Sequence, residues 1–545
     1  METRETKLSG TIVDVVAERI FKGTVTIRDK KIAEIREEDT DETGFILPGL
    51  IDAHIHIESS MLVPSEFARL AVVHGTVAAV SDPHEIANVL GINGVRFMIE
   101  NGKKVPFKFY FGASPCVPAT VFETSGAQLG LDELDILLRS EEILYMSEMM
   151  NFPGVLNGDA EVKRKLGLAR KYNKPVDGHA PGLTGEPAER YAAAGITTDH
   201  ECFTLKEAEE KIRYGMKILI REGSAARNFD ELSDLIPAFP DQIMFCSDDK
   251  HPNELVAGHI NELVKKAFQK GYDKIKVIRA CTLNPVKHYG LHAGLLQKDD
   301  PADMILVDNL DDFNVRMTFI DGEKVAENGK TLISSVVTDE PNNFNATPVS
   351  PRELRVKQEG ELIRVIKAFD GQLITQEVHV KARIENNLVM PDPANDILKI
   401  VIKERYHDKP PVTGFVTGFG LKSGAIASSV AHDSHNIIAV GTNDDSIANA
   451  INSIIQSKGG IAAESAKGTL ILPLPVAGIM TGKDGYWVAE QYEILDKQAR
   501  ESGCTLQAPF MTLSFMALLV IPELKLSDKG LFNGKLFSMT PLFVK

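Results

Sequence analysis

Eight short apolar segments follow one another between residues 45 and 252, and most of them end in polar or charged residues. Helical patterns separate most of these segments, for example at 64–74, 159–172, 186–194 and 204–214. Asp159 and Thr204 are expected to cap two of these helices, and Glu207, three residues after Thr204, would complete a capping box. Strands and helices that alternate eight times are typical of a (β/α)8 barrel. In that fold the active site lies at the carboxyl ends of the strands, which is where the polar residues of these segments cluster.

The first segment, FILPGLIDAHIHIE, ends in His54 and His56. Side chains two residues apart in a strand point to the same face, so both imidazoles would reach one metal ion. Such a pair by itself is equally typical of a metal site and of two ordinary histidines at the end of a strand. The metal interpretation therefore depends on the segments that follow.

Later segments supply more imidazole and carboxylate groups. Glu148 lies between Met146 and Met149, where a carboxylate is costly unless it is paired with a metal or, as the alternative, with a buried cation. Asp248 and Asp249 precede Pro252 and would otherwise cap a helix. The expected metal ligands are His54, His56, Glu148, His179, His200 and Asp248.

This ligand set is larger than one catalytic ion with an open coordination position requires. It predicts two divalent ions with a shared carboxylate, and imidazole and carboxylate groups accept manganese, iron or zinc. Two close ions hold a water and lower its pKa to about 7, and a neighbouring carboxylate can take the proton. The natural reactions are hydrolysis of an amide or removal of an amino group from a heterocycle.

The chain carries 60 Lys and Arg against 76 Asp and Glu, a net charge of −16. This charge argues against nucleic acid or a membrane surface as the main partner. The five cysteines form no CxxC pair, and the first residues contain no apolar signal segment, so we expect a cytoplasmic protein. The apolar stretch near 511–522 is too short to span a bilayer and is expected to be buried.

A chain of 545 residues is too long for one core. Short β-like units at 1–47 return at 295–345, and we predict that they pair into one small β-domain beside a barrel at 48–294. A Pro- and Ser-containing break near 346 predicts a C-terminal domain at 346–545, mixed α/β or α+β. It should contain antiparallel strands with solvated faces, and a helix at 445–458 that stops at Gly459.

The motifs of this chain resemble those of the amidohydrolase superfamily and, within it, of the adenine deaminases. The resemblance covers nearly the whole chain and rests on PGLIDAHIHIESSM, VSDPHEIANV, YMSEMMNFPGV, DGHAPGL, TTDHECF, FCSDDKHP and ACTLNPVKHYGL. It implies a distorted (β/α)8 TIM-like barrel, a β-domain from both flanks and an extra C-terminal domain. It also implies two metal ions, manganese or iron before zinc, a homodimer, and conversion of adenine and water to hypoxanthine and ammonia in purine salvage.

The resemblance also implies roles for the ligands. His54 and His56 would bind one ion with Asp248, and His179 and His200 would bind the other. Glu148 would bridge them, at the position where many relatives carry a carboxylated lysine. YMSEMMN contains no lysine, so the hydantoinase and dihydroorotase pattern fails here.

For catalysis we expect Asp248 to accept the proton of the attacking hydroxide and to pass it to the ring or the leaving amine. Glu201 or His84 would protonate a ring nitrogen. Weaker candidates for orienting the base are Glu85, Asp249 and Arg221, which would otherwise form salt bridges or loop caps.

The run SSVAHDSHN places His432, Asp433, Ser434 and His435 together in the third domain. It is either a solvated turn or a loop that reaches the barrel mouth, where it would close the pocket or supply a further ligand.

Three other functions fit the sequence less well. An N-acetyl-sugar phosphate deacetylase also uses a glutamate at its metal site, but no Arg/Lys cluster for a phosphate stands at the strand ends. A catalytically dead scaffold would have lost metal ligands, and none is lost. A base-flipping nucleic-acid deaminase requires an HxE…PCxxC zinc motif, which this chain lacks.

Overall fold

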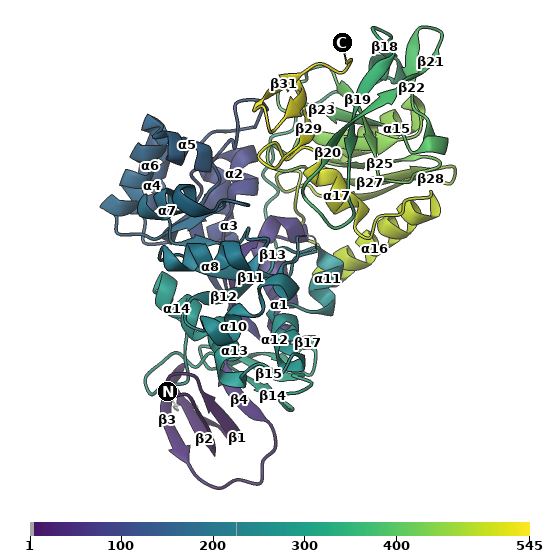
Figure 1. The fold of residues 1–545 in the computed structure, drawn as a ribbon. Coiled ribbons are helices and arrows are strands. Elements are labelled where there is room, and N and C mark those ends of the chain that lie inside the picture. Colours follow the sequence, from purple (N-terminus) through teal and green to yellow (C-terminus); the bar gives the residue numbers. More distant parts are fainter. Residues whose placement is uncertain (1–4, 225, 545) are drawn as a thin grey trace.

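The computed structural model describes residues 5–224 and 226–544, and its centre is a barrel of parallel strands (Figure 1). Six strands pair in the order β13-β5-β6-β7-β8-β9 and three in the order β10-β11-β12. The barrel closes because β13 continues the chain after β12 and pairs with β5. The strands are β5 (Leu50–His56), β6 (Thr76–Ser81), β7 (Lys108–Ala113), β8 (Ile143–Met149), β9 (Val176–Gly178), β10 (Thr198–Asp199), β11 (Lys217–Arg221), β12 (Ile243–Cys246) and β13 (Asp248–Asp249).

The eight predicted apolar segments form the barrel strands, the last segment being divided into β12 and β13, so the predicted distorted TIM-like barrel is confirmed. The distortion lies between β9 and β10, which belong to separate sheets; the Thr197 N–H donates across this gap to the Val176 carbonyl (2.8 Å). The barrel helices are α1 (Pro64–Ala71), α2 (His84–Leu90), α3 (Ile92–Gly102), α4 (Leu131–Arg139), α5 (Phe152–Asn157), α6 (Ala160–Lys171), α7 (Gly185–Ala193), α8 (Leu205–Arg213), α9 (Phe229–Leu232), α10 (Leu235–Ala238), α11 (Pro252–Ala257), α12 (Ile260–Gln269), α13 (Lys274–Ala280) and α14 (Leu283–Tyr289).

Two predicted helix caps show how local sequence sets these boundaries. Asp159 caps α6 by accepting from the N–H groups of Glu161 and Val162. Thr204 caps α8 by accepting from the Glu207 N–H. The reciprocal half of the predicted capping box is wrong, because the Glu207 carboxylate accepts instead from the N–H groups of Phe203 and Gly182.

Both flanks of the barrel contribute to a second sheet, with strand order β17-β16-β15-β14-β4-β1-β2-β3. Its central strand β4 leads directly into barrel strand β5 through Gly49, so this sheet fixes where the barrel begins. Figure 1 shows β1–β4 with β14 and β15 at the end opposite the C-terminus. The strands are β1 (Glu5–Asp14), β2 (Arg19–Arg28), β3 (Lys31–Glu37), β4 (Phe45–Pro48), β14 (Met304–Val307), β15 (Val315–Ile320), β16 (Glu323–Glu327) and β17 (Lys330–Thr331).

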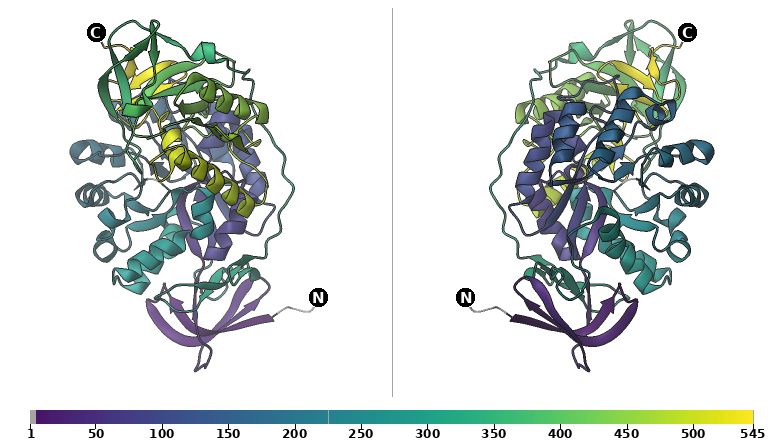
Figure 2. Two further views of the ribbon diagram at one scale, coloured as in Figure 1. Left: turned by 90° about the vertical axis from the view of Figure 1, so that its right-hand side faces the viewer. Right: turned by 90° about the vertical axis from the view of Figure 1, so that its left-hand side faces the viewer.

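Residues 332–350 contain neither helix nor strand and run along the outside of the molecule to the C-terminal domain (Figure 2). The largest sheet there has the order β20-β19-β24-β23-β26-β25-β27-β28. Neighbouring strands are antiparallel as predicted, except that β19 pairs in parallel with β24. These strands are β19 (Leu362–Lys367), β20 (Gln376–Lys381), β23 (Leu398–Lys403), β24 (Val412–Thr417), β25 (Ala425–Ser428), β26 (Ile437–Gly441), β27 (Gly460–Ser465) and β28 (Gly468–Pro473).

The prediction of a solvated face is wrong for β23, which is buried along its whole length. Its two lysines are satisfied internally: Lys399 donates to the Leu354 carbonyl (3.0 Å) and Lys403 to Asp408 (2.8 Å). Around this sheet lie β18 (Val356–Lys357), β21 (Arg383–Glu385), β22 (Leu388–Met390), β29 (Leu524–Ser527), β30 (Gly530–Asn533), β31 (Ser538–Thr540), α15 (Asp444–Ser457), α16 (Gly485–Glu501) and α17 (Pro509–Phe515).

The predicted helix at 445–458 is α15, which buries Ile447, Ile451 and Ile454 against the sheet. It ends one residue earlier than expected, because Lys458 already adopts the left-handed conformation. The predicted buried apolar element near 511 is α17, in which every residue is buried.

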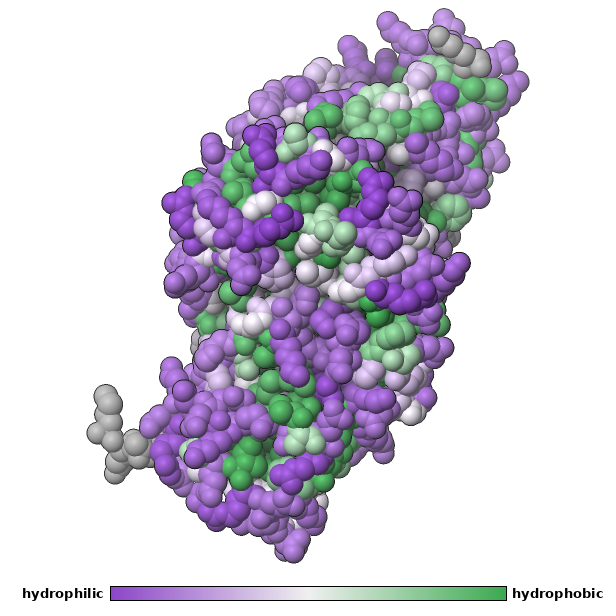
Figure 3. All heavy atoms as spheres, turned by 60° about the vertical axis from the view of Figure 1, so that its left-hand side comes forward, coloured by the Kyte–Doolittle hydropathy of each residue, from purple (hydrophilic) through white to green (hydrophobic). Residues whose placement is uncertain are grey.

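Hydrophobic residues on the face drawn in Figure 3 form separate patches among hydrophilic ones. Among the helices of residues 5–224 and 226–544, none is long and apolar enough to cross a membrane.

Gly49 is the hinge between the small sheet and the barrel, and a side chain there would meet a buried neighbour. A Cβ atom on Gly49 would lie 2.9 Å from Val77 Cβ in β6. We expect Gly49→Ala to lower the free energy of unfolding by about 1–3 kcal/mol through overpacking, measured by chemical denaturation. In the Val77→Ala background the same substitution should cost clearly less. An equal cost in both backgrounds would contradict this contact as the cause.

Candidate active site

The six expected metal ligands lie together at the carboxyl ends of the barrel strands. His54 and His56 are in β5, Glu148 is in β8, and Asp248 is in β13. His179 follows β9 and His200 follows β10. All six are buried, and His179, the most exposed, keeps only 7% of its surface. Residues spread over almost 200 positions meet here because parallel strands bring their carboxyl ends to one rim.

Glu148 lies at the centre of the cluster, with two imidazoles facing each of its oxygens. Oε1 is 3.6 Å from His56 Nε2 and 3.5 Å from His84 Nδ1. Oε2 is 2.9 Å from His179 Nδ1 and 3.3 Å from His200 Nε2. A carboxylate with a separate set of nitrogens on each oxygen has the arrangement expected of a bridge between two ions.

Asp248 faces the strand-end histidine pair. Its Oδ1 is 3.3 Å from His56 Nε2 and 3.6 Å from His54 Nε2. Its Oδ2 accepts from Arg221 Nη1. The alternative prediction of a helix cap is wrong for Asp248 and Asp249, because the cap residue of α11 is His251. Asp249 instead accepts from the Ser59 hydroxyl at the edge of the pocket.

Arg221 is buried at the end of β11 and holds Glu201 in a bidentate pair, with N–O distances of 2.6 and 2.8 Å. Burial acts to raise the pKa of Glu201, but Arg221 and His179 outweigh it and hold that pKa below its ordinary value. Burial likewise opposes ionisation of Asp248, and Arg221 and the two histidines hold its pKa well below the usual range. Both groups are therefore carboxylates at neutral pH.

The cluster holds more carboxylates than permanently charged cations, which is the balance expected of a site that binds a metal cation: Glu148, Glu201 and Asp248 stand against Arg221. Burial lowers the pKa of His200, yet Glu148 and Glu201 raise it well above its ordinary value. Within the described part of the chain, both ring nitrogens of His54 and the Nε2 atom of His179 have no hydrogen-bond partner. Buried polar atoms without partners are costly, and divalent ions would satisfy them. The residues present thus fit two metal ions.

His84 borders this cluster at the start of α2. Its Nδ1 is 3.1 Å from Asp82, whose other oxygen accepts from the Ser114 and Ser147 hydroxyls (2.6 and 2.7 Å). Asp82, directly after β6, is thereby held by hydroxyl groups from the end of β7 and from β8, and it orients His84. The SDPH motif contained both residues, but its sequence did not show that Asp82 acts through its neighbour.

A second buried carboxylate below the site, Asp52, was missed by the sequence reasoning. It accepts from His259 Nε2 (2.8 Å) and from the Ser247 N–H (3.0 Å), directly before Asp248. It therefore links the strand of the histidine pair to the segment that carries Asp248. The signal available in the sequence was an acidic residue within a strand that otherwise carries only apolar residues and the histidine pair.

The C-terminal domain closes the mouth of the barrel. Glu85 contacts His432 Nδ1 with one oxygen and His435 Nε2 with the other. Burial opposes the charge of Glu85, but these two histidines hold its pKa well below the usual range. The 432–435 run is thus a buried loop at the site and not a solvated turn. The pocket is further lined from this domain by Leu373, Asp433, Phe515 and Leu518.

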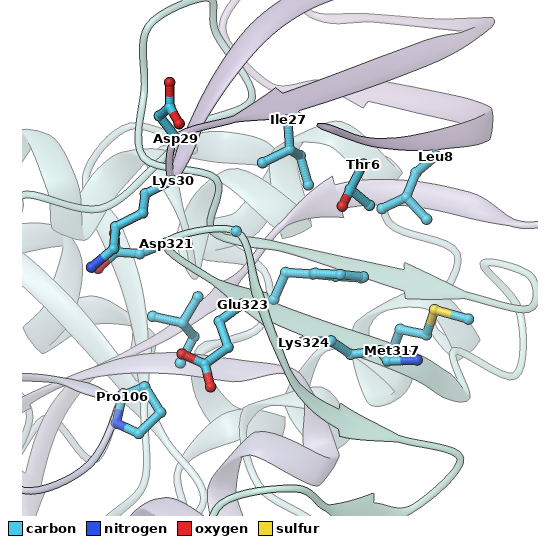
Figure 4. A pocket seen from close by; sticks show the side chains of 13 residues that line it. Thr6, Leu8, Ile27, Asp29, Lys30, Pro106, Met317, Asp321, Glu323 and Lys324 are labelled. Atoms are coloured by element: carbon cyan, nitrogen blue, oxygen red, sulfur yellow. The ribbon is translucent and has the colours of Figure 1, made fainter. Parts of the chain in front are cut away.

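The pocket over the metal-ligand cluster has a volume of about 30 Å³, room for a few water molecules. A larger open hollow of about 970 Å³ lies against the small β-sheet, where Leu8 and Ile27 mix with Asp29, Lys30 and Lys324 (Figure 4). None of the expected site residues lines that hollow. Size therefore does not identify the functional site, whereas the chemistry of the lining does.

Comparison with known proteins agrees with this arrangement. The chain is 55% identical to an adenine deaminase of a Sulfurovum species over 97% of this chain and 98% of that protein. It is 52% identical to an adenine deaminase of Methanosarcina mazei over 98% and 99%, and 46% identical to one of Borreliella burgdorferi over 97% and 98%. The chain belongs to the adenine deaminase family.

Two family models divide the chain in keeping with this membership. Residues 45–325 match the amidohydrolase family, and residues 372–538 match the adenine deaminase C-terminal domain. Among solved structures, the chain is similar to N-acetylglucosamine-6-phosphate deacetylase from Thermotoga maritima, with 15% identity, 59% of this chain and 100% of that one covered, and a TM-score of 0.45.

Arg221 provides a test of how the carboxylates around the cluster are held. Arg221→Lys keeps the charge but loses the bidentate geometry, so we expect a loss of activity of about 10–100-fold, as is typical for groups that orient ligands. The measurement is the initial rate of ammonia release from adenine, and circular dichroism checks that the variant is folded. Arg279→Lys is the matched control, because Arg279 also pairs with two carboxylates, Glu18 and Asp241, but lies away from the pocket. Equal losses in the two variants would contradict a role of Arg221 at the site.

Proposed function

We propose that this protein hydrolyses adenine to hypoxanthine and ammonia. The observation that carries the proposal is Glu148, a buried carboxylate with two imidazoles on each oxygen, in a chain whose family membership covers almost its full length. A reaction that replaces an amino group by oxygen requires an activated water and a route for its protons. The residues around Glu148 supply both.

Two divalent ions, manganese or iron before zinc, would lower the pKa of a shared water to about 7 when bound. We assign His54, His56 and Asp248 to one ion, and His179 and His200 to the other. Glu148 would bridge the two ions, because each of its oxygens faces a different pair of imidazoles. Arg221 keeps Asp248 and Glu201 ionised and in place, which fixes the donor atoms before any ion arrives.

The proton route follows from the contacts of the acidic groups. Asp248 accepts the proton of the attacking water and delivers it toward the leaving amine. His84 is the better placed of the two expected acids, since Asp82 orients its Nδ1 and leaves Nε2 toward the pocket. Glu201 is paired to Arg221 through both oxygens and serves to position other groups. Glu85 and Asp249 line the pocket and orient the base, whereas Arg221 does not line it and acts through Glu201 and Asp248.

The wider assignments rest on the family and the composition. We propose that the protein works in purine salvage in the cytoplasm as a homodimer, with no nucleic-acid or membrane partner, in line with its net charge of −16. We also propose three structural units: the small β-domain at 1–47 and 295–345, the barrel at 48–294, and the C-terminal domain at 346–545.

Metal removal tests the chemistry of the proposal. Adenine turnover by the purified protein, followed as ammonia release, should disappear after chelation and return when Mn²⁺ is added, because the cluster lacks the positive charge that activates water. Acetate release from an N-acetyl-sugar phosphate is the comparison reaction. Adenine left untouched in every metal form would rule out the proposed activity.

Glu148→Gln tests the bridge itself. The amide keeps the size of the side chain but removes the charge, so we expect turnover to fall to background and the bound metal content to drop, with the circular dichroism spectrum unchanged. Glu66→Gln is the control, because Glu66 is also a buried glutamate but pairs with Arg69 and does not line the pocket. Near-parental rates in Glu148→Gln would mean that the bridging group is misassigned.

A further inference from the structure

The C-terminal domain contributes two polar groups, His432 and Asp433, and an apolar wall to the pocket. Leu373, Phe515 and Leu518 form the apolar part, opposite the metal-ligand cluster. The ring of Phe515 stacks on His432 with centroids 4.9 Å apart and planes at 23°. A flat aromatic substrate suits such a wall. A purine is larger than the cavity, so these apolar side chains must shift to admit it.

Of these two polar groups, His432 is paired with Glu85, and Asp433 is the one that can meet a ligand. It is 3% exposed and lines the pocket. Its Oδ1 is 3.6 Å from His84 Nε2, while Oδ2 has no hydrogen-bond partner in the portion of the chain that the structure describes. A buried carboxylate oxygen with no donor is costly. It therefore marks a place where a ligand N–H is missing.

The loop that carries Asp433 is fixed on both sides. The flanking His432 and His435 contact Glu85 of the barrel. The Ser434 carbonyl accepts from the Tyr406 hydroxyl (2.6 Å), and the Asn436 amide donates to the Thr124 carbonyl (2.9 Å). Asp433 is thus held rigidly, as a group that discriminates between substrates must be.

The chemistry of the substrate limits which donor can reach Asp433. The amino group of adenine must lie at the water held near Glu148, and the His84 ring separates Glu148 from Asp433. The remaining N–H of the free base is on its five-membered ring. A nucleoside has no such hydrogen, because the sugar replaces it at N9.

We infer that Asp433 accepts a hydrogen bond from the five-membered-ring N–H of bound adenine and thereby selects the free base over N9-substituted adenines. This inference rests on the proposed function. It gives the C-terminal domain a direct part in substrate choice, since Asp433 touches the substrate while the barrel performs the chemistry.

The test compares adenine with 9-methyladenine, which keeps the amino group but lacks the N–H. In the parent protein, 9-methyladenine should inhibit or react about 100-fold less well than adenine, because it leaves the carboxylate unpaired. In Asp433→Asn the KM for adenine should rise by about 100-fold, a larger factor than any fall in kcat, and the preference for adenine over 9-methyladenine should shrink. The bound metal content should stay that of the parent.

Asp528→Asn is the matched control. Asp528 belongs to the same domain and accepts from the N–H and hydroxyl of Thr124 (2.8 and 2.6 Å), but it does not line the pocket. Its KM for adenine should be that of the parent. An equal rise of KM in both variants would overturn the inference in favour of domain docking.

Three other results would also overturn the inference. An unchanged KM in Asp433→Asn would show that the charged acceptor contributes nothing to the binding of adenine. A loss of metal in that variant would make Asp433 a metal ligand. Equal affinity of the parent for both bases would refute the selection without any variant, even if Asp433→Asn does not fold. A parent inactive on adenine would instead refute the proposed function.

Discussion

The charge balance around Glu148 is the constraint on which the rest of the structure depends. A carboxylate at this depth is costly unless cations or hydrogen bonds surround it. Here four imidazoles face its two oxygens, and other carboxylates in turn face those imidazoles. Arg221 offsets only part of the negative charge, since it is taken up by Glu201 and Asp248. The fold thus maintains a deficit of positive charge that metal ions can fill.

The supporting structure keeps these groups in place before any ligand arrives. Asp52 links the histidine-bearing strand to the segment of Asp248, and Asp82 orients His84 across three strands. Glu85 extends the same principle between domains, because its carboxylate pairs with two histidines more than 340 residues away. Each link is a buried contact of a carboxylate, and most are charge-assisted hydrogen bonds, which are shorter and stronger than neutral ones.

Particular residues show where sequence reasoning succeeded and where it failed. The eight barrel strands and the caps Asp159 and Thr204 were predictable, because strand period and capping chemistry are local properties. Lys399 and Lys403 misled the prediction for β23, because alternation marks a solvated face only when no partner covers the lysines. The orienting role of Asp82 depends on Ser147 in β8 and on Ser114 directly after β7, and no local pattern reveals such contacts.

The sequence alone determined the types of chemical group at each strand end and, through the order of strands, that these ends would share one rim. This conclusion does not depend on the exact strand bounds, because parallel strands all place their carboxyl ends on the same side of the barrel. Only the tertiary structure decided which oxygen of Glu148 faces which imidazole, and that Asp433 enters the pocket. Those facts depend on how two domains dock, which is governed by contacts between residues hundreds of positions apart.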